Sequence, residues 1–382
     1  MRVIVVGAGS FGSWCAWNLL NSGVDVTLID AWGPGNSRAS SGGETRVIRT
    51  VYGADDFYIE MSKRSMDLWS AFQSNLNEPL MEFTGSLWLC GDDDSYVESS
   101  RKKIESLGMR LENFSVKEST KLWPGIDFTD IAKVIFEPCA GFLRARRSCD
   151  AVKRDFEKRG GQYLQATVGS IDETKRTNSV RLSTGTTITA DQIVFACGPW
   201  LKQLFPETIG RYLNISRQEV YYFGTPENDN HFTQERLPVW LELSTPIFYG
   251  IPEVDYRGFK IAIDQRGEEF NPSVDDRTPT EHLVELTRSY LQKRFPALAQ
   301  APLLESRVCQ YTNTPSGHFL MDRHPETGNW ILGGGCGHGF KMGPAMGEIL
   351  AEAILRDKPV PNPFRFEHLT SQVNKTTQFD HA

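Results

Sequence analysis

The run Gly7-Ala8-Gly9-Ser10-Phe11-Gly12 decides the fold, because it fits the pattern G-x-G-x-x-G close to the start of the chain. The apolar residues 2–6 before it predict a short buried strand, and residues 11–21 after it predict a helix. In this pattern the first glycine permits a tight turn and the second lets backbone approach a pyrophosphate. The third permits close helix–strand packing. The pattern predicts a dinucleotide site and does not separate NAD from FAD.

A second strand, residues 24–29, completes a βαβ unit and ends at Asp30, where a carboxylate can hold ribose hydroxyls. This opening predicts an α/β fold with a parallel sheet and helices on its faces. Helix–strand alternation returns from Ser148 to Gly198, and residues 56–73, 281–294 and 345–356 have the spacing of further helices. The alternative is a glycine turn that binds nothing.

Composition excludes several classes of protein. A chain of 382 residues usually folds into about two or three domains. The net charge of −7 argues against nucleic acid as a partner. No apolar run approaches the roughly 20 residues that cross a membrane, and the first one stops at Gly7, too early for a signal peptide.

Cysteine usage favours a reducing compartment. The seven cysteines are odd in number, scattered and without a CxxC pair, so we expect neither a disulfide framework nor a metal site. A cytoplasmic location is the simplest expectation. The final Asp380-His381-Ala382 is not the Ser-Lys-Leu peroxisomal signal.

Basic side chains mark the next candidate segment, Gly42-Gly43-Glu44-Thr45-Arg46-Val47-Ile48-Arg49. If this stretch is helical, Arg46 and Arg49 lie on one face, because they are three residues apart. Guanidinium groups suit carboxylate or phosphate oxygens. The alternative is a solvated pair of surface arginines.

Cys309 stands in the run Arg307-Val308-Cys309-Gln310-Tyr311-Thr312-Asn313-Thr314, and a glycine-rich segment, residues 333–341, follows. Such a loop lets backbone lie against a planar ligand, and a helix that starts near Met342 stabilises negative charge on it. Lys260 lies in an otherwise apolar strand, where it either reaches water or has a chemical role. Cys309 can instead be a small buried hydrophobe, and His338 can simply satisfy backbone groups.

These segments together resemble the monomeric sarcosine oxidase family. The family includes N-methyltryptophan oxidase and the fructosyl amino acid oxidases, which are FAD-dependent amine oxidases of the D-amino-acid oxidase superfamily. The resemblance runs from the N-terminus to about Glu352 and is concentrated in three motifs. These motifs are the glycine pattern, Gly43 to Arg49, and Cys309 to Lys341.

The resemblance implies FAD attached covalently through a thioether between Cys309 and the 8α-methyl group. The cofactor-binding residues that it implies are Gly7, Gly9, Ser10, Phe11, Gly12, Asp30, Thr45, Arg46, Val168, Cys197, Gly198, Cys309, Gly337, His338, Gly339 and Lys341. Its implied catalytic residues are Lys260, Arg46 and His338, with Lys260 beside flavin N5, where dioxygen is reduced.

The resemblance also implies a substrate site. Arg49 and Lys341 hold the substrate carboxylate, and Tyr311 lines the pocket. Asp264 stands where sarcosine oxidases have a histidine. An acid there favours a cationic or polyhydroxylated substituent over a second carboxylate. We therefore expect a larger N-substituted amino acid than sarcosine, with Amadori compounds among the candidates.

The resulting prediction is a two-domain α/β enzyme. A Rossmann-like FAD-binding domain of mixed parallel sheet comprises residues 1–80, 145–212 and 320–382. A substrate domain with a large antiparallel sheet comprises 81–144 and 213–319. The expected enzyme is monomeric and oxidises the C–N bond of a secondary-amine amino acid to an imine, reducing dioxygen to hydrogen peroxide. The alternatives are a dehydrogenase with another electron acceptor and a non-catalytic dinucleotide-binding regulator.

Overall fold

The computed structural model describes residues 1–370 and has a mixed α/β fold. The helices are α1 (Ser10–Asn21), α2 (Asp56–Gln73), α3 (Ser95–Ser106), α4 (Val116–Leu122), α5 (Ala145–Lys158), α6 (Leu201–Leu204), α7 (Glu281–Arg294) and α8 (Gly343–Arg356). The first strands are β1 (Arg2–Val6), β2 (Asp25–Asp30), β3 (Thr45–Ile48), β4 (Met81–Glu82), β5 (Ser86–Cys90), β6 (Glu112–Phe114), β7 (Lys133–Glu137), β8 (Gly141–Arg144) and β9 (Gln162–Gln165). The remaining strands are β10 (Ser179–Arg181), β11 (Thr187–Thr189), β12 (Gln192–Phe195), β13 (Asn214–Phe223), β14 (Val239–Leu243), β15 (Ile247–Ile251), β16 (Phe259–Asp264), β17 (Leu303–Asn313), β18 (Leu320–Arg323) and β19 (Trp330–Gly333).

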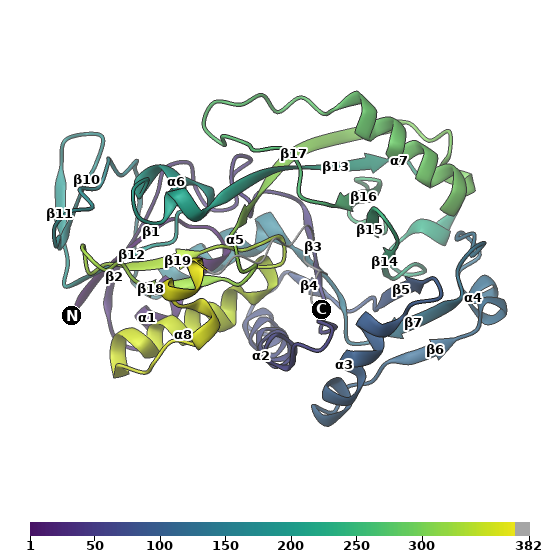
Figure 1. Ribbon diagram of the computed structural model, residues 1–382, viewed down its shortest axis with the longest axis horizontal. Helices are drawn as coiled ribbons and strands as arrows, with labels where there is room; N and C mark the ends of the chain where they lie inside the picture. Colours follow the sequence, from purple (N-terminus) through teal and green to yellow (C-terminus); the bar gives the residue numbers. More distant parts are fainter. Residues whose placement is uncertain (371–382) are drawn as a thin grey trace.

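A six-stranded sheet contains the predicted βαβ unit, in the order β18-β19-β12-β1-β2-β9. All neighbouring pairs are parallel except β18 and β19. Val3, Ile4 and Val5 of β1 have no exposed surface, as expected for a strand covered on both faces. Helices α1 and α8 lie side by side against this sheet (Figure 1).

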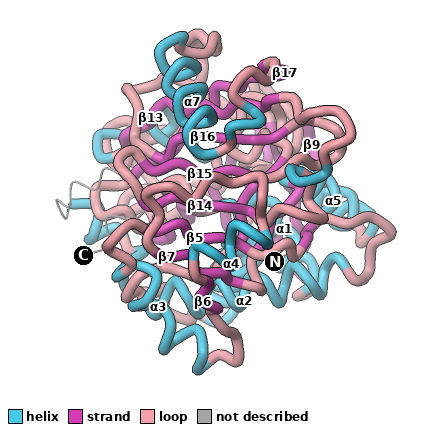
Figure 2. Tube along the Cα trace, turned by 90° about the vertical axis from the view of Figure 1, so that its right-hand side faces the viewer, coloured by secondary structure: helices cyan, strands magenta, loops and turns pink. Residues whose placement is uncertain are grey.

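The second large sheet has eight strands, in the order β17-β13-β16-β15-β14-β5-β7-β6. It is antiparallel except between β14 and β5. Figure 2 shows its strands following one another, with α7 packed on one face. An aromatic core between α7 and this face includes Trp240, Phe259 and Tyr290. The opposite face of β16 carries Lys260 and Asp264, because side chains alternate along a strand.

The segment with the two arginines is a strand, so the helix considered from its spacing is wrong. Residues Thr45–Ile48 form β3, which pairs antiparallel with β8. The β-branched Val47 and Ile48 fit a strand better than a helix. Positions three apart in a strand face opposite sides. Arg46 and Arg49 therefore enter different surroundings.

The prediction of α/β architecture with one mostly parallel and one large antiparallel sheet is confirmed. The longest strands of this sheet are β13, with 10 residues, and β17, with 11. They pair with each other along nearly their whole length, which supports longer strands than sequence alternation alone suggests. The two-domain boundaries stay a prediction, and the C-terminal tripeptide lies outside the described residues.

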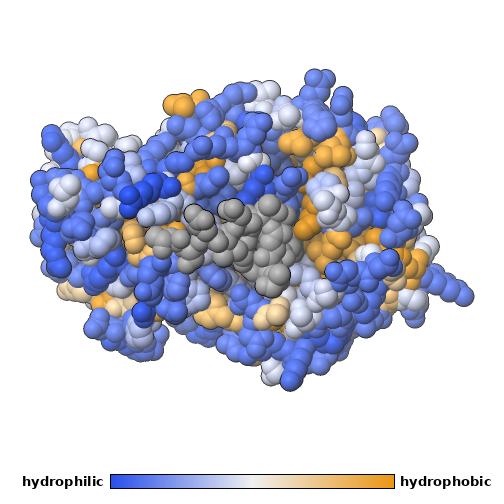
Figure 3. All heavy atoms as spheres, viewed as in Figure 1, coloured by the Kyte–Doolittle hydropathy of each residue, from blue (hydrophilic) through white to orange (hydrophobic). Residues whose placement is uncertain are grey.

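The surface in Figure 3 is mostly hydrophilic, with hydrophobic residues in scattered patches. Within residues 1–370, no helix is both long and apolar enough to cross a membrane. The same residues hold no cluster of three His, Cys, Asp or Glu side chains suited to a metal ion. All seven cysteines fall in this part of the chain, and no two of them form a disulfide.

Candidate active site

A large cavity of about 580 Å³ starts at the glycine loop after β1 and reaches β17 and the glycine-rich loop before α8. This volume is in the range of small-molecule and cofactor sites. Many of the predicted ligand-binding residues line it. These are Gly7, Gly9, Ser10, Phe11, Asp30, Arg46, Val168, Cys197, Gly198, Cys309, Tyr311, Gly337 and Gly339.

The glycine loop closes tightly on the sheet. Gly7 has φ +106°, and a Cβ there would lie 2.3 Å from the carbonyl oxygen of Ala196. A Cβ on Gly12, which does not line the cavity, would lie 1.8 Å from the carbonyl oxygen of Gly7. Only glycine permits this approach of α1 to the strand. The α1 N-terminus has neither a side-chain cap nor an acidic residue in its first turn, so its amides suit an anion.

Asp30 lies at the end of β2 and holds the loops around it. Its carboxylate accepts hydrogen bonds from the backbone amides of Ala8 at 2.7 Å and of Trp32 and Gly33 at 2.9 Å. Burial raises the pKa of Asp30, although these three amides act in the opposite direction. A carboxylate has about four acceptor positions, so three amides leave room for a ligand hydroxyl.

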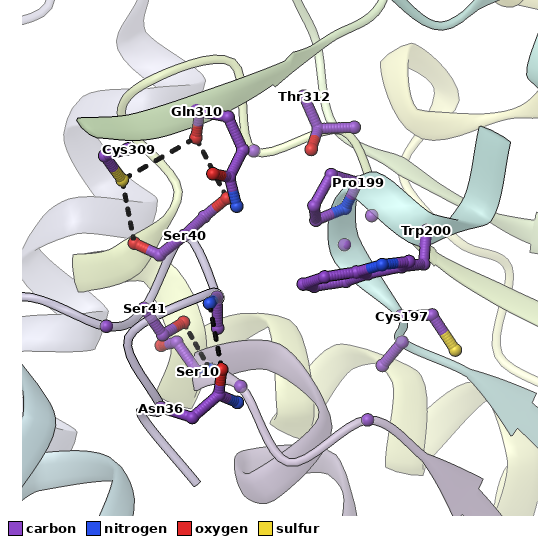
Figure 4. Close-up of a pocket in the computed structure, with 18 of the residues that line it drawn as sticks. Ser10, Asn36, Ser40, Ser41, Cys197, Pro199, Trp200, Cys309, Gln310 and Thr312 are labelled. Atoms are coloured by element: carbon purple, nitrogen blue, oxygen red, sulfur yellow. Dashed lines mark hydrogen bonds between the residues drawn. The ribbon is translucent and has the colours of Figure 1, made fainter. Parts of the chain in front are cut away.

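Two serines that the sequence reading missed join this loop to the rest of the site. The backbone amide of Ser10 donates to Ser41 Oγ at 3.0 Å, and the Ser40 hydroxyl donates to the Gln310 carbonyl at 2.9 Å. Figure 4 shows them between the α1 N-terminus and Cys309. Their position before Gly42 and Gly43, in a small-residue loop, is a signal that could have found them.

Cys309 faces the cavity from β17, beside Arg46 of β3. Arg46 lies 4.0 Å from Cys309 Sγ and donates to the carbonyl oxygens of Ser40 at 2.8 Å and Thr45 at 2.9 Å. Ser40 and Cys309 lie across the pocket from Cys197 and Trp200 (Figure 4). The site thus puts a thiol and a guanidinium together at the end of the cavity away from Asp30.

Lys260 lies next to Arg46 and does not itself line the large cavity. Its Nζ donates to the Thr45 carbonyl oxygen at 2.7 Å, the same oxygen that Arg46 uses. Burial, and secondly the charge of Arg46, lower the pKa of Lys260 well below its usual value. A buried lysine and a partly buried arginine on one acceptor favour an anion nearby.

A second basic pair surrounds Tyr52. The Arg49 guanidinium lies 4.5 Å and the Lys341 Nζ 5.1 Å from the centre of the Tyr52 ring. Both side chains are buried, and Lys341 Nζ donates to the His338 carbonyl at 3.1 Å. Burial, and secondly the charge of Arg49, lower the pKa of Lys341 well below its usual value.

Two buried carboxylates accompany this pair. Glu137 accepts hydrogen bonds from the Thr50 hydroxyl at 2.6 Å and the Trp88 indole at 3.3 Å, and burial raises its pKa. Asp264 accepts one from the Tyr311 hydroxyl at 3.2 Å. Glu137 was missed, because a lone acid in strand β7 carries no motif.

His338 is placed differently from its glycine neighbours. Its ring packs 4.7 Å from that of Phe319, and its Nδ1 lies 3.2 Å from the Tyr52 hydroxyl. Gly337 and Gly339 line the cavity, whereas His338 does not. A catalytic role for His338 stays a prediction, as do the ligand contacts of Thr45, Lys341, Arg49 and Asp264, which also do not line the large cavity.

The arrangement suits one long ligand with phosphates at one end and a planar, anionic group at the other. Backbone amides and Asp30 serve the first end, and Arg46 with Cys309 serves the second. Arg49 and Lys341 nearby suit a carboxylate. Such a site supports redox chemistry on a bound cofactor, because the described residues offer no nucleophile–base pair aimed into the large cavity.

Comparison with known proteins identifies the family to which the chain belongs. Residues 2–353 match the family described as FAD dependent oxidoreductase, DAO. The chain is 30% identical over 368 residues to the monomeric sarcosine oxidase of Bacillus sp. (strain NS-129), covering 93% of each chain. It is 27% identical over 385 residues to the peroxisomal sarcosine oxidase of Homo sapiens, covering 96% of each.

Among solved structures, the L-proline dehydrogenase of P. horikoshii superposes with a TM-score of 0.82 at 22% identity, covering 96% of this chain and 97% of that one. At this identity the likeness concerns the fold alone. The family match over most of the chain goes further. The protein belongs to the FAD dependent oxidoreductase (DAO) family and is an enzyme related to the amine-oxidising sarcosine oxidases.

Proposed function

We propose that the protein is an FAD-dependent oxidase of secondary-amine amino acids, with its flavin attached to Cys309. One observation carries this proposal: Cys309 Sγ and Arg46 lie together in the same cavity as the dinucleotide loop. A single FAD would need its phosphates and its flavin ring at these two places. Family membership already makes the protein an enzyme, so the alternative of a non-catalytic regulator falls away.

The residues present fit FAD. Gly7 and Gly9 have no side chains, so the backbone amides at the start of α1 stay accessible to a ligand. The Asp30 carboxylate keeps one acceptor position for a ribose hydroxyl. Arg46 offers positive charge beside the flavin ring, close to the proposed point of attachment at Cys309. Cys309 is the cysteine beside Arg46, and a thioether would form at its sulfur. When bound, the flavin supplies the two-electron acceptor for amine oxidation.

Substrate recognition is proposed for Arg49 and Lys341. Two buried cations over one aromatic ring repel each other, so a carboxylate placed between them is stabilised by both. Glu137 lies among the charges that act on Lys341, as does Asp264. These acids offset part of the positive charge and leave the pair suited to a single carboxylate.

Asp264 is the proposed selectivity residue. It is buried and faces the same side of β16 as Lys260, with Tyr311 as a donor. A carboxylate here favours a substrate whose nitrogen substituent is cationic or rich in hydroxyls, and disfavours a second acid. The proposed substrates are therefore N-substituted amino acids larger than sarcosine, with Amadori compounds as the leading candidates.

Lys260 is proposed to assist the reduction of dioxygen. Its ammonium form would stabilise negative charge that develops on oxygen, which is worth most in a buried site. The site geometry supports this, because Lys260 lies directly beside Arg46, both donating to one carbonyl. A dehydrogenase that passes electrons elsewhere needs no such cation.

The test is a panel of N-substituted amino acids read by peroxide release, together with amine consumed. We expect about one peroxide per amine oxidised and the fastest turnover with large, hydroxyl-rich substituents. Oxidation of amine without peroxide would establish the dehydrogenase. No oxidation of any secondary amine would remove the proposed substrate class.

Assembly and location remain proposals. We expect a monomer, in line with relatives named monomeric sarcosine oxidase, and a cytoplasmic enzyme, in line with seven cysteines that form no disulfide with one another. Light scattering of the purified protein and fractionation of its native cells test the two expectations.

A further inference from the structure

Lys260 has a second neighbourhood that the proposed reaction leaves unused. A small cavity of about 10 Å³ touches Lys260 and is distinct from the large one. Its other lining includes Tyr222, Thr45 and Glu44, and it is bordered by Arg147 and Arg257. Its volume is close to the roughly 10–15 Å³ that one water molecule needs.

Tyr222 is the residue that points to an occupant of this small cavity. It is directly opposite Lys260 across the β13–β16 ladder, so the two side chains emerge on the same face within about 5 Å of each other. Its side chain is only 3% exposed, and its hydroxyl has no hydrogen-bond partner among residues 1–370. A buried hydroxyl without a partner costs roughly 1–3 kcal/mol.

The tyrosines of β13 differ on this point. Tyr221, which faces the opposite side of the strand, donates to Glu219 at 2.6 Å. Tyr222 instead lies on the face of β13 that carries Lys260 across the ladder, and both residues line the small cavity. The fold therefore places an unbonded hydroxyl beside a buried amine at a cavity of one-water size.

The small cavity also reaches towards solvent. Arg147 and Arg257 at its border have side chains 52% and 40% exposed. Each forms an ion pair at the cavity lining: Arg147 lies 3.0 Å from Asp255, and Arg257 lies 3.7 Å from Glu44. The small cavity thus has exposed charged side chains on one side and the buried Lys260 on the other, so it connects the surface to Lys260 by a short polar path.

We propose that the small cavity binds one water, which bridges the Tyr222 hydroxyl and the Lys260 amine and carries protons from the surface to Lys260. The inference rests on the proposed oxidase function. It makes Tyr222 a positioning residue that acts through Lys260. It also separates the entry of protons from the large cavity, which the cofactor would fill.

The proton balance shows why such a route is needed. Oxidation of a neutral secondary amine transfers two electrons and one hydrogen to the cofactor as a hydride equivalent, and the protonated imine then loses a proton. Reduction of one dioxygen to hydrogen peroxide consumes two electrons and two protons. The hydride equivalent accounts for both electrons and one proton. The other proton is delivered to dioxygen separately from the hydride, and the proton that the imine releases replaces it in the overall balance. Lys260 can donate this proton and be reprotonated through the bridging water.

The kinetic test uses Tyr222→Phe in the holoenzyme, reduced with dithionite so that no amine is involved. Mixing with dioxygen should show flavin reoxidation slowed about 10- to 100-fold, at the low end of general acid–base effects. Tyr163→Phe is the matched control, since its hydroxyl is also buried without a partner among the described residues. Unchanged reoxidation in Tyr222→Phe, or equal slowing in both variants, overturns the proposal.

A double variant distinguishes a route through Lys260 from a general packing defect. If Tyr222 acts through Lys260, adding Tyr222→Phe to Lys260→Met should slow reoxidation no further. Multiplying effects would contradict the proposal. Failure of the proposed function has a different signature, because amines would then fail to reduce the flavin in the wild-type protein.

A crystal structure of the holoenzyme supplies a readout independent of activity. It should show one ordered water within hydrogen-bond distance of both Tyr222 Oη and Lys260 Nζ, and loss of that water in Tyr222→Phe. A Tyr222 hydroxyl bonded directly to a protein group, with no water in the small cavity, overturns the proposal.

Discussion

Two regions of the site are suited to bind negative charge, and they do so with different groups. The dinucleotide region consists of Gly7 to Gly12 with Asp30. The basic region consists of Arg46, Arg49, Lys260 and Lys341. The dinucleotide region uses backbone amides, a helix N-terminus and glycines that keep side chains away. The basic region uses charged side chains from β3, β16 and the loops beside them, of which Arg49, Lys260 and Lys341 are buried and Arg46 is partly buried. Local sequence thus determines the first region, and tertiary packing assembles the second.

The physical difference is one of cost. Backbone amides at a helix end are polar but uncharged, so they accept an anion without a buried net charge of their own. Buried basic groups lose solvation, which is why burial lowers the pKa of both Lys260 and Lys341. The lysines of the basic region therefore either bind an anion or lose a proton more readily than an exposed lysine. The uncharged amides of the dinucleotide region do neither at the same cost.

The largest effect is expected when Lys260 is removed from the basic region. Lys260→Met should slow flavin reoxidation by about 100- to 1000-fold, because one preorganised charge in a buried site is removed. Reduction by amine should change only a few-fold. Stopped-flow measurement of the two half-reactions checks this, with Lys63→Met, at a partly exposed lysine, as control. Equal slowing of both half-reactions would mean that Lys260 does not act on dioxygen.

A glycine pair tests the dinucleotide region. Gly7→Ala places a Cβ 2.3 Å from a carbonyl oxygen at a position with φ +106°. Gly23→Ala places a Cβ with no atom within 4 Å at a position with φ +84°. We expect a loss of about 1 kcal/mol in the free energy of unfolding for Gly23→Ala. The loss for Gly7→Ala should be about 3 kcal/mol, with weaker flavin retention. Urea unfolding measures both, and equal losses would argue against the close approach at Gly7.

Asp264 tests selectivity within the basic region. Asp264→His should shift the ratio of kcat/KM values about 10-fold towards small N-methyl amino acids and away from hydroxyl-rich or cationic substrates. Asp264→Asn keeps the shape and an acceptor for Tyr311 and serves as the control for charge alone. An unaltered substrate ranking in both variants would show that Asp264 does not face the substrate.

The smallest effect near neutral pH comes from titration of Lys260. Burial and Arg46 lower the pKa of Lys260, Arg307 adds to this, and Cys309 and Glu44 oppose it. The ammonium form, present below the pKa, is the form that assists dioxygen. Reoxidation should therefore slow as the pH rises through a value below that of an ordinary lysine. A profile that is flat, or the same in Lys260→Met, would contradict this assignment.

The sequence predicted the dinucleotide region well, because its turn, helix and acid are neighbours in the chain. It singled out Arg46, Arg49 and Lys260 from their local patterns, but only the family resemblance gave them roles in one site. It considered a helix at residues 45–48, which form the strand β3. The side-chain period of two shows that Tyr221 and Tyr222 face opposite sides of a strand. It does not show which of them is inside the site, since that depends on how β13 pairs with β16 and β17.

The most direct test of the central claim is mass spectrometry of the unfolded, flavin-loaded protein after digestion. The account predicts that the peptide containing Cys309 carries the added mass of FAD, and that Cys309→Ala holds its flavin without a covalent bond or not at all. An unmodified Cys309 peptide from fully loaded wild-type protein would contradict the account.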